Sequence, residues 1–405
     1  MKSNFYWVGL GLIATLVFLP AIAYGHAFGA RYDLPLPLEF YLSAAGITVG
    51  VSFLVSFLFV KPERRVALDV AFPVNRIVST FFSRLAQISG LILLALLLIS
   101  ALIGDPSPTK NLATVTIWVL WWVGFTLFSA LFVNLWPWLN PFRTFALCLC
   151  QFLPIWCAKT RSLPTLVPYN AVIGLLILSW IELVSDISEI PVQLFWLIVF
   201  YLVSSCFCAC RYGVDTWFNQ ADPLTRMFDM MGRAAPISFT GTAGIVIRVP
   251  GVGLRQQTGT ASTLFILALI SVVMFDGLSE TSLWRSVLDF FSQSQLLRPR
   301  LLDLKSAGLD ILKLLKTGGL LSMFLIVCAA YGLLVVFIWL AARCEISLAL
   351  IAVRFAPSLL SIAIAYHLAH YVSYLLLAGQ LILPILSDPL ALGWDLFGTR
   401  ALRID

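Results

Sequence analysis

Residues Pro357–Leu386 read PSLLSIAIAYHLAHYVSYLLLAGQLILPIL, an apolar run without Asp, Glu, Lys or Arg. A helix needs about 20 consecutive apolar residues to cross the hydrocarbon layer of a bilayer, and this run exceeds that length. The whole chain has the same character, because 60% of its 405 residues are hydrophobic and only 11% are charged. A soluble domain carries about 25% charged residues. The sequence therefore predicts an all-α, polytopic integral membrane protein whose main partner is the lipid bilayer.

Similar apolar runs recur along the chain, and we predict about nine transmembrane helices in a single domain covering residues 1–405. Their expected bounds are Phe5–Tyr24, Leu38–Val60, Ile88–Ile103, Ala113–Val133, Ala171–Val184, Val192–Cys210, Ala261–Phe275, Gly319–Ala341 and Pro357–Leu386. The segment Phe145–Ala158 is shorter and contains Pro154. We expect it to be a re-entrant or interfacial piece.

Basic residues set the expected orientation, because Lys and Arg accumulate in cytoplasmic loops. The segments Lys61–Arg84 and Arg211–Thr260 are basic, whereas Asp105–Lys110 and Asp186–Glu189 are not. We therefore expect a cytoplasmic N-terminus and an outer C-terminus. The net charge of +6 is spread over these loops, so it is interpreted as a topology signal, and no nucleic-acid partner is expected.

Residues 1–25 have two interpretations. Lys2, a long apolar stretch and the small residues near Gly25 fit either a cleaved secretory signal or a retained membrane anchor. Cleavage after Gly25 would make His26 the N-terminal residue, whose amino group and ring could bind one metal ion together.

Two loops are expected to carry amphipathic helices. In the cytoplasmic loop of residues 211–260, Asp222 and Pro223 form a helix start, and the helix to Arg233 is expected to lie on the inner membrane surface. The stretch Gly244–Leu254 could form a hairpin. In the outer loop of residues 276–317, two more amphipathic helices are expected at Ser282–Ser292 and Leu301–Lys316.

The chain has three histidines, and two of them, His367 and His370, stand one helical turn apart inside the last apolar run. An imidazole in hydrocarbon is costly and marks a cavity, a partner or a ligand. We expect His26, His367 and His370 to converge on a pocket open to the outer face and to bind a divalent metal, zinc or copper. A non-metal cavity and hydrogen bonding between helices are the alternatives.

Carboxylates are expected at the mouth of the same pocket. Asp33, Asp276 and Asp388 are candidate catalytic residues, and Asp395 lies nearby in sequence; each could orient an imidazole or act as a general base. Capping of helix ends is the alternative. Glu182 could line a path, although reaching to the interface is the preferred interpretation. Cys206 and Cys210 share a helix face and could bind a soft metal, although packing is preferred.

Several strings resemble a bacterial family of multi-span membrane proteins named fenitrothion hydrolase. These strings are GHAFGARYDLPLP (25–37), WLNPFRT (138–144), FDGL (275–278) and, in the C-terminal run from Phe355 to Thr399, YHLAHY (366–371), SDP (387–389) and GWDLFGT (393–399). The resemblance implies a membrane-bound organophosphate hydrolase that cleaves the P–O bond to an aryl group. It also implies a location in the bacterial inner membrane.

The sequence therefore leads to a first hypothesis, a membrane-embedded, metal-dependent hydrolase of small apolar phosphoesters. A transporter or metal-handling membrane protein that binds its cargo through the three histidines is the alternative. A structural or assembly subunit is a third.

Overall fold

The computed structural model describes residues 70–153, 164–240, 244–256 and 259–400, together with Ser43, Ile47 and Leu402. The expected helix Phe5–Tyr24, nearly all of Leu38–Val60, and the candidate residues His26 and Asp33 lie outside the described residues. The chain forms two compact units. Among the described residues, Gly277–Asp303 belongs to the first, and residues 70–276 and 304–402 to the second.

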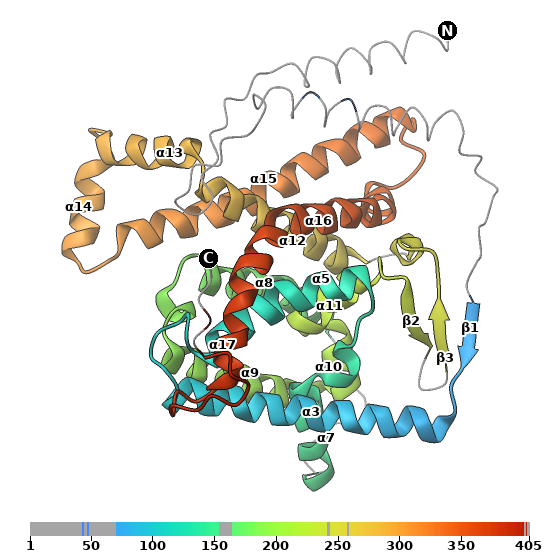
Figure 1. Cartoon of the computed structure of the whole chain (residues 1–405). Helices are drawn as coiled ribbons and strands as arrows, with labels where there is room; N and C mark the ends of the chain where they lie inside the picture. Colours follow the sequence, from blue (N-terminus) through green and yellow to red (C-terminus); the bar gives the residue numbers. More distant parts are fainter. Residues whose placement is uncertain are drawn as a thin grey trace. The chain divides into compact units, whose positions relative to one another are not determined.

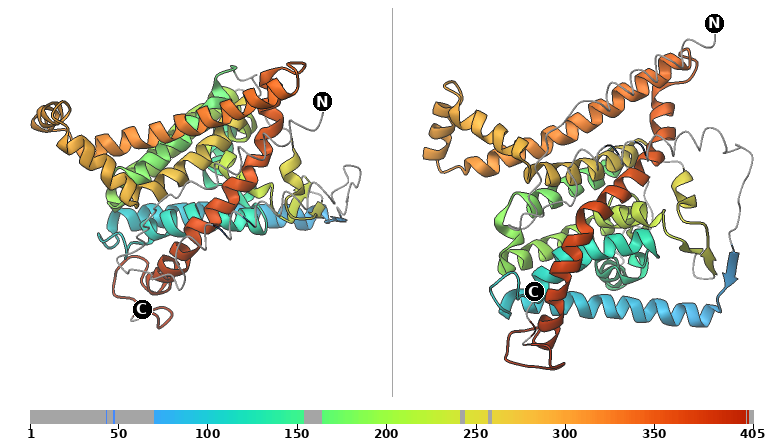
Figure 2. Two further views of the ribbon diagram at one scale, coloured as in Figure 1. Left: turned by 90° about the horizontal axis from the view of Figure 1, so that it is seen from above. Right: turned by 45° about the horizontal axis from the view of Figure 1, so that its top comes forward.

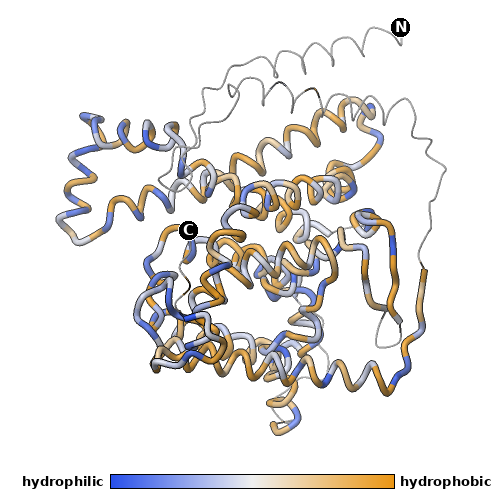
Figure 3. The backbone as a smooth tube through the Cα atoms, in the orientation of Figure 1, coloured by the Kyte–Doolittle hydropathy of each residue, from blue (hydrophilic) through white to orange (hydrophobic). Residues whose placement is uncertain are grey.

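Helices dominate the described residues, as predicted (Figure 1). Within the part of the chain that the structure describes, six helical segments are long and apolar enough to cross a membrane. They are Arg76–Ile103 (α3), Leu112–Leu131 (α4, η1 and α5), Pro191–Tyr212 (α9), Thr260–Ser279 (α12), Ile311–Ala341 (α15) and Leu348–Ser387 (α16, η5 and α17). A seventh predicted span is the shorter helix Asn170–Leu183 (α8). Hydrophobic residues predominate along α3 and α15 (Figure 3). The total of nine transmembrane helices stays a prediction.

Short helices connect these long ones. They are Trp136–Leu139 (α6), Pro141–Phe152 (α7), Val214–Gln220 (α10) and Pro223–Gly232 (α11), with 3₁₀ turns at Val167–Tyr169, Asp186–Ser188 and Val252–Arg255. The Asn140 side chain caps α7 by accepting a hydrogen bond from the Arg143 N–H at 3.0 Å. The described part of the predicted re-entrant segment is therefore a helix that begins four residues before Phe145.

A small antiparallel sheet with the order β1-β3-β2 interrupts the helical pattern. Its strands are Val70–Pro73 (β1), Ile237–Thr240 (β2) and Gly244–Ile247 (β3), and β1 leads into α3 (Figure 2). The prediction of a hairpin within Gly244–Leu254 is wrong: that stretch holds one strand, β3, which pairs with the preceding β2, and Gly251, with a φ of 82°, turns the chain after it. The strand β1 was not predicted.

Helix α11 corrects the prediction of a membrane-surface helix at Asp222–Arg233. Its start is as expected, since Asp222 Oδ2 accepts a hydrogen bond from the Thr225 N–H at 2.8 Å. Its apolar side chains are covered by protein, however: Met227 and Met231 are each 1% exposed and Phe228 is 0% exposed. Neighbouring helices α5 and α8 pack against α11, so no apolar face remains for lipid.

In the loop that is predicted to lie outside, the helix Ser282–Gln293 (α13) matches the first prediction. The second, Leu301–Lys316, is wrong because two helices share that stretch. The helix Arg298–Ser306 (α14) ends before Gly308, whose φ is 88°, and Asp310 caps α15 by accepting from the Leu312 N–H at 2.9 Å. Residues 311–316 therefore belong to a membrane-length helix.

Gly90 allows α3 and α6 to approach closely, and its replacement should reveal this contact. A Cβ atom at Gly90 would lie 2.1 Å from the carbonyl oxygen of Leu139, a backbone atom that has little room to move. We expect Gly90→Ala to lower the free energy of unfolding by about 1–3 kcal/mol. The matched control is Gly332→Ala in α15, where a Cβ meets nothing within 4 Å. Alanine favours the helix there by about 0.5–1 kcal/mol. Thermal unfolding in one detergent compares the two, and equal midpoints would contradict the packing argument.

Candidate functional site

The two histidines of the last apolar run lie on α16, and one of them contacts a carboxylate from α12. The Nε2 atom of His370 lies 2.9 Å from Asp276 Oδ2. The hydroxyl of Tyr371 donates to the same oxygen at 2.8 Å. Among the described acidic residues that the sequence singled out, Asp276 is therefore the one that the structure joins to a histidine.

This contact fixes the tautomer of His370. When Asp276 is ionised it only accepts hydrogen bonds, so Nε2 then carries the hydrogen and a neutral His370 has its lone pair on Nδ1. The His370 side chain is 26% exposed and that of Asp276 is 18% exposed. A histidine held by a carboxylate in this way has a more basic second nitrogen, which suits either proton transfer or metal binding.

His367 lies one turn earlier and is almost completely enclosed. It is 6% exposed, and its Nδ1 atom has no hydrogen-bond partner among the described residues. Its ring lies 5.0 Å from the ring of Tyr371, centroid to centroid. A buried polar atom without a partner is costly, and such atoms in native proteins call for an explanation such as a bound ion or water.

A second carboxylate, Glu182 on α8, joins the cluster. Its Oε2 atom is buried and has no partner among the described residues, while the Trp122 indole hydrogen-bonds to the side chain. Glu182 also interacts electrostatically with Asp276 and with Tyr371. The preferred interpretation, that Glu182 reaches the interface, is wrong. Leu175 and Ser179 are buried, and Glu182 continues their face of α8 at helical spacing.

The two aspartates after the last helix serve their own loop. Asp388 accepts hydrogen bonds from the N–H groups of Leu392 and Gly393 at 2.8 and 2.9 Å. Asp395 accepts from the Ser387 hydroxyl at 3.0 Å and from the Arg400 N–H at 3.2 Å. These contacts fit the alternative of a local structural role rather than the expected catalytic role of Asp388.

Two of the three predicted metal ligands, His367 and His370, lie in this cluster, and the third, His26, lies outside the described residues. His367 Nδ1 has no hydrogen-bond partner among the described residues, and His370 contacts Asp276 through Nε2; imidazole nitrogens are ligands that zinc and copper accept. No group of three or more His, Cys, Asp or Glu side chains arranged to hold a metal occurs in the part of the chain that the structure describes. The three-histidine site that includes His26 therefore stays a prediction.

Two of the cysteine groups meet between helices α7 and α9. Cys206 and Cys210 share a face of α9, and Cys210 Sγ lies 3.7 Å from Cys150 Sγ of α7. Cys206 is buried, as the packing interpretation expects.

The fold and the site together define a helix-rich protein whose membrane-length helices surround a carboxylate–histidine–tyrosine cluster. No protein-family model, curated protein or solved structure matches the chain.

Proposed function

We propose that this chain is a membrane-embedded hydrolase of small, apolar phosphoesters in a bacterial inner membrane. The observation that carries the proposal is the contact of His370 with Asp276, which leaves a basic imidazole nitrogen inside a bundle of apolar helices. The resemblance to the fenitrothion hydrolase family supports the same reaction. Ionisable residues within membrane segments usually mark functional sites.

In this proposal, His370 acts as the general base. Its Nδ1 atom accepts a proton from water while the water oxygen bonds to phosphorus. The P–O bond to the aryl group then breaks, and the imidazolium returns the proton to the departing aryloxide. The products are a phosphodiester and a phenol. Asp276 stabilises the imidazolium, and the Tyr371 hydroxyl holds the same carboxylate oxygen in place.

His367 and His370 are the described residues that would hold a divalent metal. A bound metal would polarise the phosphoryl oxygen and lower the pKa of a water molecule. His370 would then be a ligand, and its contact with Asp276 would orient the ring.

Turnover of a neutral aryl phosphotriester tests the proposal. Purified full-length protein should release 4-nitrophenolate from diethyl 4-nitrophenyl phosphate faster than detergent micelles alone. Loss of this activity in a chelator, and its return with Zn²⁺ or Cu²⁺, indicates the metal-dependent form. Activity that a chelator leaves unchanged indicates His370 as the base. Absence of turnover in both metal-free and metal-loaded protein contradicts the proposal.

A specific observation favours the second candidate, a transporter or metal-handling protein. The Oε2 atom of Glu182, which has no partner among the described residues and interacts electrostatically with Asp276, is a potential cation site within the bundle. Protein reconstituted into liposomes should then move Zn²⁺ across the membrane without consuming a phosphotriester. Liposomes that contain the Glu182→Gln variant should lose that flux.

The proposed orientation has its own test. The basic loops predict a cytoplasmic N-terminus and an outer C-terminus. Reporter fusions after Arg84 and after Asp405 should therefore report opposite sides of the membrane. If both reporters are active on the same side, the orientation is wrong.

A further inference from the structure

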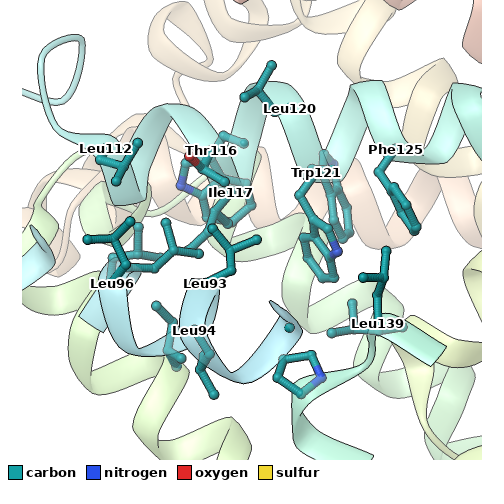
Figure 4. Close-up of a pocket in the computed structure, with 18 of the residues that line it drawn as sticks. Leu93, Leu94, Leu96, Leu112, Thr116, Ile117, Leu120, Trp121, Phe125 and Leu139 are labelled. Atoms are coloured by element: carbon teal, nitrogen blue, oxygen red, sulfur yellow. The ribbon is translucent and has the colours of Figure 1, made fainter. Parts of the chain in front are cut away.

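A large apolar cavity lies within the second unit, beside the cluster. Its volume is about 490 Å³, and α3, η1, α6, α9 and α17 supply most of its walls. Volumes of about 300–1,000 Å³ are typical of sites for small organic ligands. Figure 4 shows Trp121, Phe125 and Leu139 at one end of this cavity.

Some polar groups in the walls are committed to other partners, whereas Trp118 Nε1 is buried and has no hydrogen-bond partner among the described residues. The hydroxyl of Tyr201 donates to Asp222, and Trp136 Nε1 donates to Thr225 Oγ1 at 3.3 Å. Most of the remaining lining consists of leucine, isoleucine and aromatic side chains. An ion or a strongly polar molecule would lose its hydration here without replacement, so the occupant must be neutral and mostly apolar.

The aromatic walls favour a planar occupant. Trp118, Trp121, Trp122, Trp136, Phe125 and Tyr201 all line the cavity. Their rings form edge-on and tilted pairs, with centroids 5.3 Å apart for Trp121 and Trp136 and 6.1 Å apart for Trp118 and Trp122. Rigid rings at these angles offer both faces and edges to another ring, whereas a flexible alkyl chain gains no such contacts.

The cavity and the polar cluster share a wall. Trp122 lines the cavity and hydrogen-bonds to Glu182. Leu178 also lines the cavity and stands one turn before Glu182 on α8. A molecule in the cavity therefore lies one side-chain layer from the carboxylates.

We propose that this cavity binds a neutral aromatic molecule that enters from the lipid phase. Leu93 lines the cavity and is 46% exposed, so one edge reaches the outside of the bundle. Binding can be measured without turnover. Only the further step, that the bound ring is the aryl group of the substrate, rests on the proposed function.

Tryptophan quenching by 1-nitronaphthalene, a neutral aromatic probe, tests the proposal on the full chain in lipid nanodiscs. We expect saturable quenching with wild-type protein. Leu93→Trp should narrow the cavity and weaken binding at least tenfold. The matched control Ile92→Trp adds the same side chain at an exposed neighbour that does not line the cavity, and its affinity should equal that of the wild type. If Leu93→Trp unfolds, Leu96→Trp replaces it at a second lining position.

Two results would overturn the proposal. One is quenching that rises with probe concentration without reaching saturation, or that is the same in Leu93→Trp and Ile92→Trp. In either case the probe only partitions into lipid. The other is strong quenching by brominated-chain phosphatidylcholine that the probe does not relieve, which would assign the cavity to an acyl chain. If binding is confirmed but no phosphotriester is cleaved, the cavity assignment stands and the hydrolase proposal fails.

Discussion

Asp276→Asn should lower kcat for an aryl phosphotriester by about 10²–10⁴-fold, the usual contribution of general acid–base catalysis. Asparagine can still accept the hydrogen bond from His370 Nε2, so the geometry of the site is kept. It cannot stabilise the positive charge that His370 gains when it takes a proton from water. The rate of 4-nitrophenolate release by purified protein is the measurement.

The control for this variant is Asp186→Asn, which makes the same change at an exposed carboxylate that pairs with Lys313. Its rate should match that of the wild type. Thermal unfolding in the same detergent separates loss of chemistry from loss of fold. An Asp276→Asn protein that keeps wild-type activity would exclude Asp276 from the mechanism.

Glu182→Gln should change stability and activity in opposite directions. The buried Oε2 atom of Glu182 has no partner among the described residues, and its carboxylate lies near that of Asp276. A partnerless buried polar group costs about 1–3 kcal/mol, and repulsion between the carboxylates adds to this cost. An amide at this position carries no charge and can donate as well as accept, so we expect the substitution to raise the free energy of unfolding by about 1–3 kcal/mol.

If the cluster is functional, the same variant should also lose activity. Residues of a functional site are often retained even though they lower the stability of the protein. The exposed residue Glu189 supplies the control, and Glu189→Gln should leave both quantities unchanged. Unfolding midpoints and phosphotriester turnover are measured on the same preparations. A Glu182→Gln protein that is less stable than the wild type would show that the carboxylate has a stabilising partner.

The helical architecture and part of the site could be predicted from the sequence. Long apolar runs are a strong and local signal, and the i, i+3 spacing of His367 and His370 places both on one turn wherever the helix lies. The contact between His370 and Asp276 joins residues 94 positions apart. Residue type suggested that pairing, but spacing could not show which of several aspartates would reach the ring.

The errors have a common physical cause. An apolar helix face fits lipid and protein equally well, so the pattern at Asp222–Arg233 could not show that α5 and α8 cover it. For Glu182, the face shared with Leu175 and Ser179 was a usable signal, but all faces of α8 are apolar and the inward face does not stand out. Asp388 and Asp395 follow a helix end, where capping of a loop competes with any catalytic role, and the catalytic role of Asp388 stays a prediction.

The most direct test of the central claim compares phosphotriester hydrolysis by wild-type protein and by His370→Gln, with unfolding measured in parallel. Glutamine keeps a hydrogen-bond donor toward Asp276 but cannot act as a base. We predict measurable release of 4-nitrophenolate by the wild type and a fall of at least 10²-fold in the variant at unchanged stability. Equal rates for the two proteins, or no wild-type turnover in either metal-free or metal-loaded form, would contradict the assignment of His370 and Asp276 as a hydrolytic site.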